Sequence, residues 1–429
     1  KKARHLSGFF FFRFLLFVCF FFRLLQKKFM QKHKPADKIQ DIQFFGEYGG
    51  INPSITDSST FTYLEGKTME EVFGGEREGC YLYSRHTNPS TSYLAEAIAS
   101  MENTEAAQVT ASGMGAISSV LLQLCKTEDH IISSRTIYGG TYAFMKNFLP
   151  KLGINTTFLN TTDYSQIEKS ITKKTKVIYL ESMSNPLLEV ADLKKISIIA
   201  KKNNLKLVVD NTFAPLILTP KELGADVVIH SLTKFINGAS DAVGGVICST
   251  KEFIHELIDV NNGAAMLLGP TMDAAKANSI LKNMRTLHVR IKQHSKNAKF
   301  LADKFIELGI KTFYPGIKNH PFHQNMKNQK NEGFGYGGML MIDVGNMKNA
   351  YDLMEDMQHE KIGYLAVSLG FYKTLFSAPG ASTSSEIPEE EQKEMGLSDG
   401  FIRMSVGLDN DIERTFEKIK SCMIKRNLI

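Results

Sequence analysis

Three short apolar runs in the middle of the 429-residue chain constrain its fold more than any other feature. They occupy residues 177–180, 205–209 and 227–229 and consist mainly of Val, Ile and Leu. Runs that are apolar at nearly every position are typical of strands covered on both faces. Segments with helical periodicity, such as 193–203, lie between them. This succession predicts a mostly parallel α/β sheet with crossover helices.

From about residue 286 the pattern changes, which predicts a smaller α+β domain. An amphipathic stretch over 287–305 indicates a long helix, and it is followed by strand-like and helical segments at 338–344, 350–359, 364–369 and 401–406, and by a final helix. The segment 376–393 is rich in Ser, Glu and Pro, so we expect a surface loop there. The chain is longer than a single hydrophobic core usually organises, so we expect more than one domain. We predict an N-terminal extension (1–29), an arm (30–86), a large domain (87–285) and a C-terminal domain (286–429).

The first 29 residues contain seven cations and no acid, so the formal charge of +6 becomes −1 without them. A nearly neutral body gives no support for nucleic-acid binding. The longest unbroken apolar run of this segment, 14–22, has nine residues, whereas a membrane-spanning helix needs roughly 20. We interpret 1–29 as an extension absent from the mature protein, with a targeting or anchoring segment as the alternative. For the body we expect no membrane association.

The five cysteines are widely spaced and form no CxxC pair. This spacing predicts neither a disulfide framework nor a zinc site, and it favours a reducing, cytoplasmic compartment. The histidines show no metal-ligand spacing together with carboxylates, so we expect no metal. His230 is interpreted as a packed histidine, because strand alternation turns it away from the side of Ser231.

Polar residues follow the apolar runs, at the strand ends where open parallel sheets bind ligands. Asp210 directly follows the run 205–209, and Lys234 comes shortly after 227–229. Taken singly, Asp210 is typical of a turn or helix cap and Lys234 of a solvated lysine. Together they indicate an acid and an amine around one ligand. Pyridoxal 5'-phosphate (PLP) needs such a pair: a carboxylate keeps its pyridine nitrogen protonated and a lysine forms an imine with it.

A phosphate group requires hydrogen-bond donors, and several are available. The turn 111–116 precedes an apolar helical segment, which would place the amides of Gly113 and Met114 at a helix N-terminus, where anions are favoured. Close packing of small residues is the alternative explanation. Further candidate donors are the side chains of Ser231, Thr233, Tyr83 and Arg85. No GxGxxG or GxxxxGK[ST] turn occurs at the expected strand-to-helix position, which disfavours dinucleotides and nucleoside triphosphates.

With these motifs in place, the chain resembles the Cys/Met-metabolism PLP enzymes, which include cystathionine γ-synthase, cystathionine lyases, O-acylhomoserine sulfhydrylases and methionine γ-lyase. The resemblance spans roughly residues 44–423. The stretches that carry it, in the family's order, are 83–89, 112–116, 138–140, 209–212, 231–235, 240–241, 244–245, 367–370 and 403–407. The segments 45–52, 267–271 and 382–386 look most like methionine γ-lyases of plants and some protists. The implied fold is PLP fold type I, with an aspartate-aminotransferase-like large domain.

The resemblance also implies a role for each matching residue. Lys234 would hold the cofactor and move protons, Asp210 would pair with the ring nitrogen, and Tyr138 would stack on the ring. The implied phosphate ligands and neighbouring cofactor contacts are Gly113, Met114, Thr212, Ser231 and Thr233. Tyr83 and Arg85 would reach the phosphate of a neighbouring subunit in a homotetramer, with Tyr83 as the acid for the leaving thiolate. Arg403, with Asn185 and Ser368, would clamp the substrate carboxylate.

The implied reaction is α,γ-elimination of L-methionine, or of a close sulfur amino acid, to methanethiol, 2-oxobutanoate and ammonia. Three alternatives remain: a γ-replacing transferase, a cystathionine γ-lyase, and a catalytically silent relative held at a membrane by residues 1–29. Gly140 replaces a cysteine of the bacterial methionine γ-lyases, which weakens the expectation of strict methionine preference. The segment 368–374 lacks the acid that cystathionine-specific members carry, which argues against recognition of cystathionine's distal ammonium group. Ala239 also replaces a common histidine.

Overall fold

The computed structural model describes residues 33–74, 76–77, 79–380 and 389–429. The expected extension 1–29 lies outside the described residues. Residues Pro35–Ile429 form one compact unit that contains two sheets. The domain boundaries near residues 86 and 285 therefore remain predictions within this unit.

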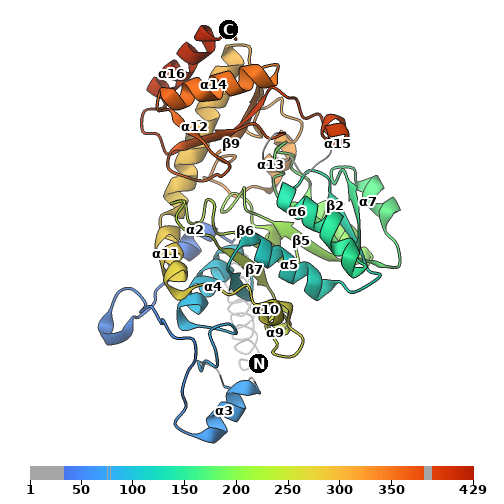
Figure 1. The fold of residues 1–429 in the computed structure, drawn as a ribbon, viewed down its shortest axis with the longest axis vertical. Helices are drawn as coiled ribbons and strands as arrows, with labels where there is room; N and C mark the ends of the chain where they lie inside the picture. The colour runs from blue at the N-terminus through green and yellow to red at the C-terminus, as the bar shows by residue number, and fades with distance from the viewer. Residues whose placement is uncertain (1–32, 75, 78, 381–388) are drawn as a thin grey trace, which may run out of the picture. The chain divides into compact units, whose positions relative to one another are not determined.

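The larger sheet has seven strands in the order β1-β7-β6-β5-β4-β2-β3 (Figure 1). The strands are β1 (Ala106–Thr110), β2 (His130–Ser134), β3 (Asn155–Leu159), β4 (Thr175–Glu181), β5 (Lys206–Asp210), β6 (Val227–Ser231) and β7 (Gly245–Ser249). Only β7 runs antiparallel to its neighbours β1 and β6; the other pairs are parallel. The three predicted strands are confirmed as β4, β5 and β6, and the predicted helix between the first two as α8 (Leu193–Lys202).

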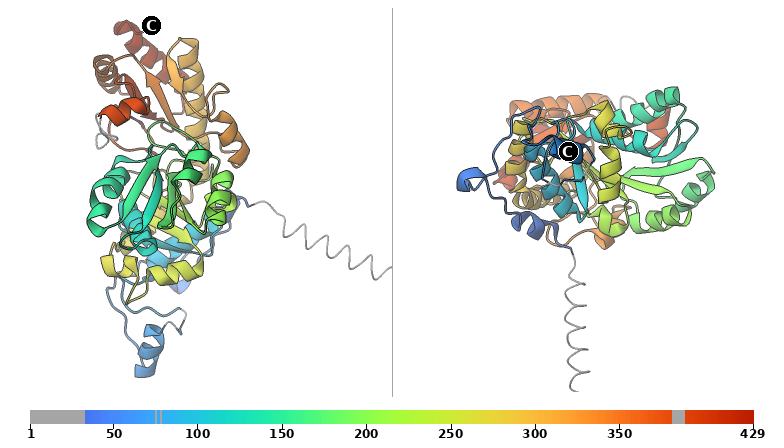
Figure 2. Two further views of the ribbon diagram at one scale, coloured as in Figure 1. Left: turned by 90° about the vertical axis from the view of Figure 1, so that its right-hand side faces the viewer. Right: turned by 90° about the horizontal axis from the view of Figure 1, so that it is seen from below.

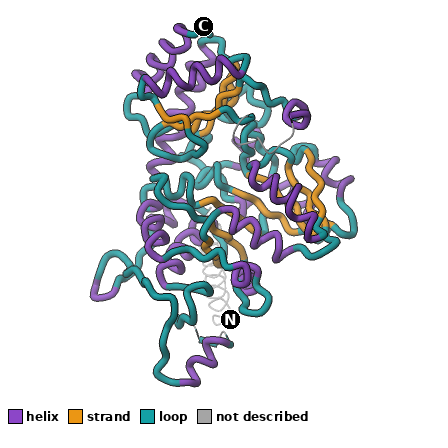
Figure 3. Tube along the Cα trace, in the orientation of Figure 1, coloured by secondary structure: helices purple, strands orange, loops and turns teal. Residues whose placement is uncertain are grey.

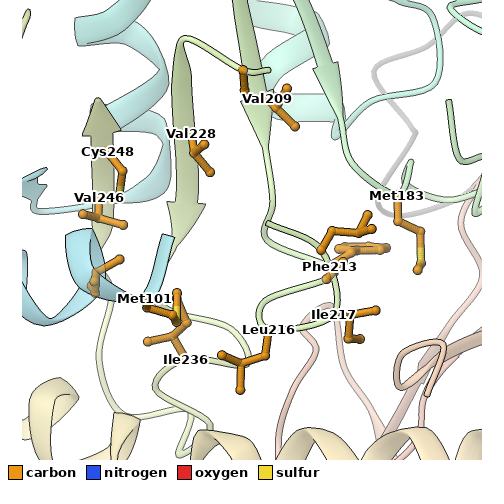
Figure 4. Close-up of a cluster of buried hydrophobic side chains, with 14 of the residues drawn as sticks. Met101, Met183, Val209, Phe213, Leu216, Ile217, Val228, Ile236, Val246 and Cys248 are labelled. Atoms are coloured by element: carbon orange, nitrogen blue, oxygen red, sulfur yellow. The ribbon is translucent and has the colours of Figure 1, made fainter. Parts of the chain in front are cut away.

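Both faces of this sheet are covered, as the continuous apolar runs predict. Val209 and Val228 pack in a core with α4 (Pro89–Glu102), α8 and α11 (Ala274–Met284), and Figure 4 shows their side chains on the same side as Met101 of α4. The next residues back along the strands, Val208 and Val227, pack in a second core with α5 (Gly113–Leu124). Alternation along each strand thus supplies two cores from one sheet.

The smaller sheet has the order β10-β11-β12-β9-β8 and is antiparallel except for the pair β10 and β11. Its strands are β8 (Lys311–Phe313), β9 (Met339–Asp343), β10 (Gly363–Leu365), β11 (Thr374–Ser377) and β12 (Phe401–Ser405). The helices α12 (Leu287–Glu307), α14 (Met347–His359) and α16 (Ile412–Lys425) pack on it. The left view of Figure 2 shows these orange and red elements gathered beside the green strands of the larger sheet.

Two predictions in this region are wrong in part. The expected strand 364–369 ends at Leu365, because the chain turns at Gly370 (φ 79°) and residues 367–369 leave the sheet to line a cavity. The expected surface loop 376–393 begins inside β11, where Phe376 is buried in the core and Ser377 pairs with Arg403. The same segment ends in a short helix, α15 (Glu389–Glu394).

The remaining α-helices are short, and Figure 3 shows them in purple. They are α2 (Pro35–Gln40), α3 (Gly66–Phe73), α6 (Gly139–Ala143), α7 (Tyr164–Ser170), α9 (Lys251–Leu257), α10 (Ala264–Leu268) and α13 (His323–Gln329), with a π-helical turn at Phe144–Phe148. Among the described residues, none of the helices combines the length and apolar character that crossing a membrane requires.

Candidate active site

A cavity of about 270 Å³ lies beyond the carboxyl ends of β4, β5 and β6, where the strand-end rule places a ligand. Most of the predicted site residues line it, although they come from both sheets. Those lining residues are Gly113, Met114, Tyr138, Asn185, Asp210, Thr212, Ser231, Thr233, Lys234, Ser368 and Arg403. Tyr83 and Arg85 do not line it.

Lys234 lies in the turn that follows β6, and its Nζ donates a hydrogen bond to Ser368 Oγ over 3.1 Å. Burial, together with the positive charge of Arg403, lowers the pKa of Lys234 to about 8. A buried amine loses part of the hydration that stabilises its charged form. Near neutral pH, this amine is therefore much closer to its uncharged, nucleophilic form than a surface lysine.

Asp210 ends β5 and is held by the residue two positions further on. Its Oδ1 accepts hydrogen bonds from the backbone N–H of Thr212 (2.9 Å) and from the Thr212 hydroxyl (2.6 Å). The same hydroxyl accepts from the N–H of Ser231 (2.8 Å), which ties the ends of β5 and β6 together. Burial is the largest effect on Asp210 and raises its pKa above the usual value. The hydrogen bonds from Thr212 and the nearby His230 act in the opposite direction but do not cancel this shift. A cation placed against this carboxylate would stabilise its ionised form.

The N-terminus of α5 faces the same cavity. Ser112 caps the helix, because its Oγ accepts from the N–H of Gly115 over 3.0 Å. A Cβ on Gly113 would lie 2.9 Å from the Cβ of Ser231, so only glycine permits this close approach. The first amides of a helix have no acceptor within the helix. The amides of Gly113 and Met114 and the hydroxyls of Ser231 and Thr233 thus form a cradle for an anion.

Arg403 enters the cavity from β12 of the smaller sheet and is almost completely buried. Its Nη1 donates to Asn185 Oδ1 over 2.8 Å. Burial lowers the pKa of Arg403 to about 10, and the nearby Glu181 opposes this shift. The guanidinium therefore stays charged at neutral pH and offers further donors to a carboxylate ligand.

Glu181 also lines the cavity, and the sequence reasoning did not select it. Its Oε1 accepts from the N–H of Tyr138 (2.7 Å) and its Oε2 from the N–H of Asn185 (2.8 Å). It thereby joins the expected stacking residue to the expected carboxylate clamp. Burial and the neighbouring Asp210 raise the pKa of Glu181 well above its usual range. Glu181 could have been found from the sequence, because it directly follows the apolar run 177–180 just as Asp210 follows the run 205–209.

Apart from Ser112, the rest of the wall is apolar, and it was not predicted from the sequence. It consists of Ile117, Met183, Phe213, Val243, Val367 and Leu369. Apolar residues in helices and loops ordinarily pack in the core or lie singly on the surface. The sequence therefore does not distinguish those that face a cavity.

Tyr83 and Arg85 lie on the N-terminal arm, outside this cavity. The Tyr83 side chain is 43% exposed, and Arg85 Nη1 donates to the carbonyl of Met266 over 3.1 Å. The Arg85 guanidinium carbon lies 5.8 Å from the centre of the Tyr83 ring. Their contact with a neighbouring subunit remains a prediction. Among the described residues, no three His, Cys, Asp or Glu side chains gather in a way that could hold a metal ion.

Comparison with known proteins identifies the family. The model of the Cys/Met metabolism PLP-dependent enzymes matches residues 39–419. A methionine gamma-lyase of Arabidopsis thaliana is 42% identical over 91% of this chain and 90% of its own length, and a cystathionine gamma-lyase of Bacillus subtilis is 37% identical over 87% and 96%. A Campylobacter jejuni structure described as an O-acetylhomoserine (thiol)-lyase, which carries N'-pyridoxyl-lysine-5'-monophosphate, superposes with a TM-score of 0.84 at 27% identity, covering 91% and 100%.

The chain belongs to this family of PLP-dependent enzymes. The cavity fits the cofactor on its own geometry, since it combines an anion cradle at α5, a buried carboxylate at Asp210 and an amine at Lys234 that burial makes less basic. An acid, an amine and an anion site in one cavity match the ring nitrogen, the aldehyde and the phosphate of PLP.

Proposed function

We propose that the chain catalyses the PLP-dependent α,γ-elimination of L-methionine, or of a close sulfur amino acid, which consumes water and yields methanethiol, 2-oxobutanoate and ammonia. The observation that carries this proposal is the position of Lys234, which shares one cavity with the guanidinium of Arg403 and with an apolar wall. The relatives named methionine gamma-lyase support the choice of reaction.

Each residue has a proposed task in this reaction. Arg403, Asn185 and Ser368 bind the substrate carboxylate and orient the α-carbon toward Lys234. The Nζ of Lys234 removes the proton from Cα and later one from Cβ. Tyr138 packs against the cofactor ring and Asp210 faces the ring nitrogen, while the amides of α5 and the hydroxyls of Ser231 and Thr233 hold the phosphate. When bound, PLP supplies an electron sink at the substrate's α-carbon.

The lining of the cavity favours a substrate whose leaving group is compact and apolar. The two carboxylates that line it are both occupied: each oxygen of Glu181 accepts a backbone N–H, and Asp210 is bonded to Thr212. The loop at 371–373 offers no acid, and Lys373 Nζ lies 5.4 Å from the centre of the Tyr364 ring. Among the described residues, the distal ammonium group of cystathionine would therefore find no free carboxylate partner in this cavity, which costs binding energy. The thioether methyl of methionine needs none.

We also propose a cytoplasmic homotetramer in which pairs of subunits share active sites. Several apolar side chains of the arm are largely exposed in the single chain, namely Phe45, Tyr48, Ile51 and Leu64. A second copy would cover such a surface, and Tyr83 and Arg85 would complete its cavity, with Tyr83 protonating the departing thiolate. The described cysteines Cys80, Cys125, Cys248 and Cys422 are all free, which supports a reducing compartment.

Purified protein supplied with PLP tests the reaction. Incubation with L-methionine alone should release methanethiol and 2-oxobutanoate, and the variant Lys234→Ala should lose both the cofactor's absorption band and the activity. Product formation that requires an O-acylhomoserine plus a thiol would instead identify a γ-replacing transferase, and turnover restricted to cystathionine a cystathionine γ-lyase. A wild-type chain that does not bind PLP would refute the proposed PLP-dependent activity.

Mixed subunits test the shared site. Tyr83→Phe and Lys234→Ala remove groups that we assign to different subunits of one site. Co-refolding the two inactive variants should restore part of the activity, because some mixed dimers contain one intact site. Unrestored activity in mixed dimers verified by mass would show that Tyr83 and Lys234 act within the same chain.

A further inference from the structure

A second polar cluster lies behind the strand ends that carry Asp210 and Ser231. It consists of Glu102 at the end of α4, Ser182 after β4, Asn211 after β5 and His230 in β6, and all four side chains are at most 1% exposed. Because side chains alternate along a strand, Asn211 points away from Asp210 and His230 away from Ser231. The packed position predicted for His230 is thus confirmed, and its partner is Glu102.

One carboxylate oxygen organises this cluster. Glu102 Oε1 accepts from His230 Nε2 over 2.8 Å and from Asn211 Nδ2 over 3.2 Å. Asn211 Nδ2 also donates to the carbonyl of Leu218 (3.0 Å), and its Oδ1 accepts from the hydroxyl of Ser182 (2.7 Å). The ends of three adjacent strands are therefore linked through Glu102 and Asn211.

Packing alone does not explain a carboxylate at this position. The residue before Glu102 in α4, Met101, belongs to the apolar core that Figure 4 shows, together with Val209, Val228, Val246 and Cys248 of the strands. Removing a carboxylate from water costs several kcal/mol, and well-packed apolar residues commonly replace buried ionic pairs without loss of stability. Within the described part of the chain, Glu102 Oε2 and His230 Nδ1 have no hydrogen-bond partner. The cluster thus leaves polar atoms unsatisfied while fixing the strand ends.

We infer that Glu102 is a positioning residue for the cofactor site. By holding Asn211 and His230, it fixes the adjacent residues Asp210 and Ser231, which face the cavity. The backbone reinforces the link, because Asn211 N–H donates to the carbonyl of Ile229 (2.8 Å) and Ser182 N–H to that of Asp210 (2.9 Å). This inference rests on the proposed roles of Asp210 and Ser231 toward PLP, and Glu102 itself does not line the cavity.

Three variants separate positioning from packing. Glu102→Gln keeps an oxygen that accepts both hydrogen bonds, whereas Glu102→Ala removes it. Ile98→Ala is the matched control, because Ile98 is buried one turn earlier on α4 and belongs to the apolar core rather than to the cluster. Each full-length variant is freed of cofactor and titrated with PLP. The dissociation constant and the visible circular dichroism of the bound cofactor are measured, together with Tm.

Glu102→Ala should weaken PLP binding by about 10-fold, equivalent to about 1.4 kcal/mol, and should change the dichroism of the bound cofactor. Glu102→Gln and Ile98→Ala should each change the dissociation constant by less than about 1.5-fold, which is under about 0.3 kcal/mol, although Ile98→Ala lowers Tm. Wild-type affinity in Glu102→Ala, or the same loss in Ile98→Ala, would overturn the inference.

Ser182→Ala keeps the inference testable if Glu102→Ala does not fold. It deletes only the hydroxyl that donates to Asn211, so PLP binding should weaken by about 3-fold; unchanged binding would contradict the inference. A wild-type chain that binds no PLP would refute the proposed function instead, so the two failures are distinguishable.

Discussion

The guanidinium of Arg403 donates a hydrogen bond to Asn185 Oδ1 over 2.8 Å, although 218 positions separate the two residues in the chain. Arg403 belongs to β12 of the smaller sheet, and Asn185 follows β4 of the larger one. The backbone N–H of Asn185 is in turn held by Glu181. The proposed carboxylate clamp is therefore assembled across the two sheets.

Replacing Arg403 by Ala should mainly raise KM for the amino acid. A hydrogen bond to a charged group contributes about 1.5–3 kcal/mol, so KM should rise by about 10- to 100-fold, while the affinity for PLP changes little. Steady-state kinetics and a PLP titration measure both. The control is Arg414→Ala, since Arg414 is exposed on α16 and does not line the cavity. An unchanged KM in Arg403→Ala would remove this residue from the clamp.

Capture of PLP by the cofactor-free protein should depend on pH through Lys234. The pKa of Lys234 is lowered to about 8, and only the neutral amine is nucleophilic. The capture rate should therefore rise with pH up to about 8 and level off above it, rather than continuing to rise toward the ordinary lysine pKa of about 10.4. Stopped-flow absorbance measures this rate. A capture rate that keeps increasing as the pH approaches this ordinary lysine value would show that the pKa of Lys234 is not lowered.

The Tyr138 ring should move when Gly140 gains a Cβ. A Cβ on Gly140 would lie 2.6 Å from Cε1 of Tyr138, closer than van der Waals contact permits, so Gly140→Ala should displace the ring. Because this ring is half-exposed and can shift, we expect weaker PLP binding by at most about 1 kcal/mol, or about 5-fold, the scale of a lost aromatic stacking contact. Gly66→Ala is the control, because a Cβ there meets no atom within 4 Å. Equal affinities for PLP in the two variants would contradict the argument.

His294 should make the fold sensitive to mild acid. Its Nδ1 lies 2.6 Å from the carbonyl oxygen of Val406, and burial lowers the pKa of His294 to about 4. Because this value is below the unfolded pKa of about 6.5, the unfolded chain binds more protons between the two values. Stability is therefore fully present above about 6.5 and falls as pH drops toward 4, by up to about 3 kcal/mol.

Urea denaturation of the cofactor-free protein at several pH values measures this loss. The variant His294→Asn retains a donor for the Val406 carbonyl and does not titrate, so its stability should depend less on pH. Replacing the exposed His255 by Asn should leave the pH dependence as in the wild type. Parallel pH profiles for wild type and His294→Asn would show that His294 does not cause the loss.

The larger sheet and the cofactor could be predicted from the amino-acid sequence. Continuous apolar runs indicate strands that are buried on both faces of a sheet. This local pattern predicted β4, β5 and β6, together with the strand ends at which Asp210 and Lys234 lie. The turn at Gly113 likewise indicated the start of α5 from its own residues. These features follow from backbone periodicity and helix-end chemistry, which act over a few residues.

Which distant groups meet depends on how the chain packs in three dimensions. The contact of Arg403 with Asn185, the bridge made by Glu181 and the cluster around Glu102 each join segments far apart in sequence. The apolar wall of the cavity could not be predicted, because an apolar side chain in a core and one facing a substrate give the same sequence signal. The early end of β10 has the same origin, since residues 367–369 leave the sheet to line the cavity, where Ser368 accepts a hydrogen bond from Lys234. Packing between the two sheets, rather than local preference, sets these positions.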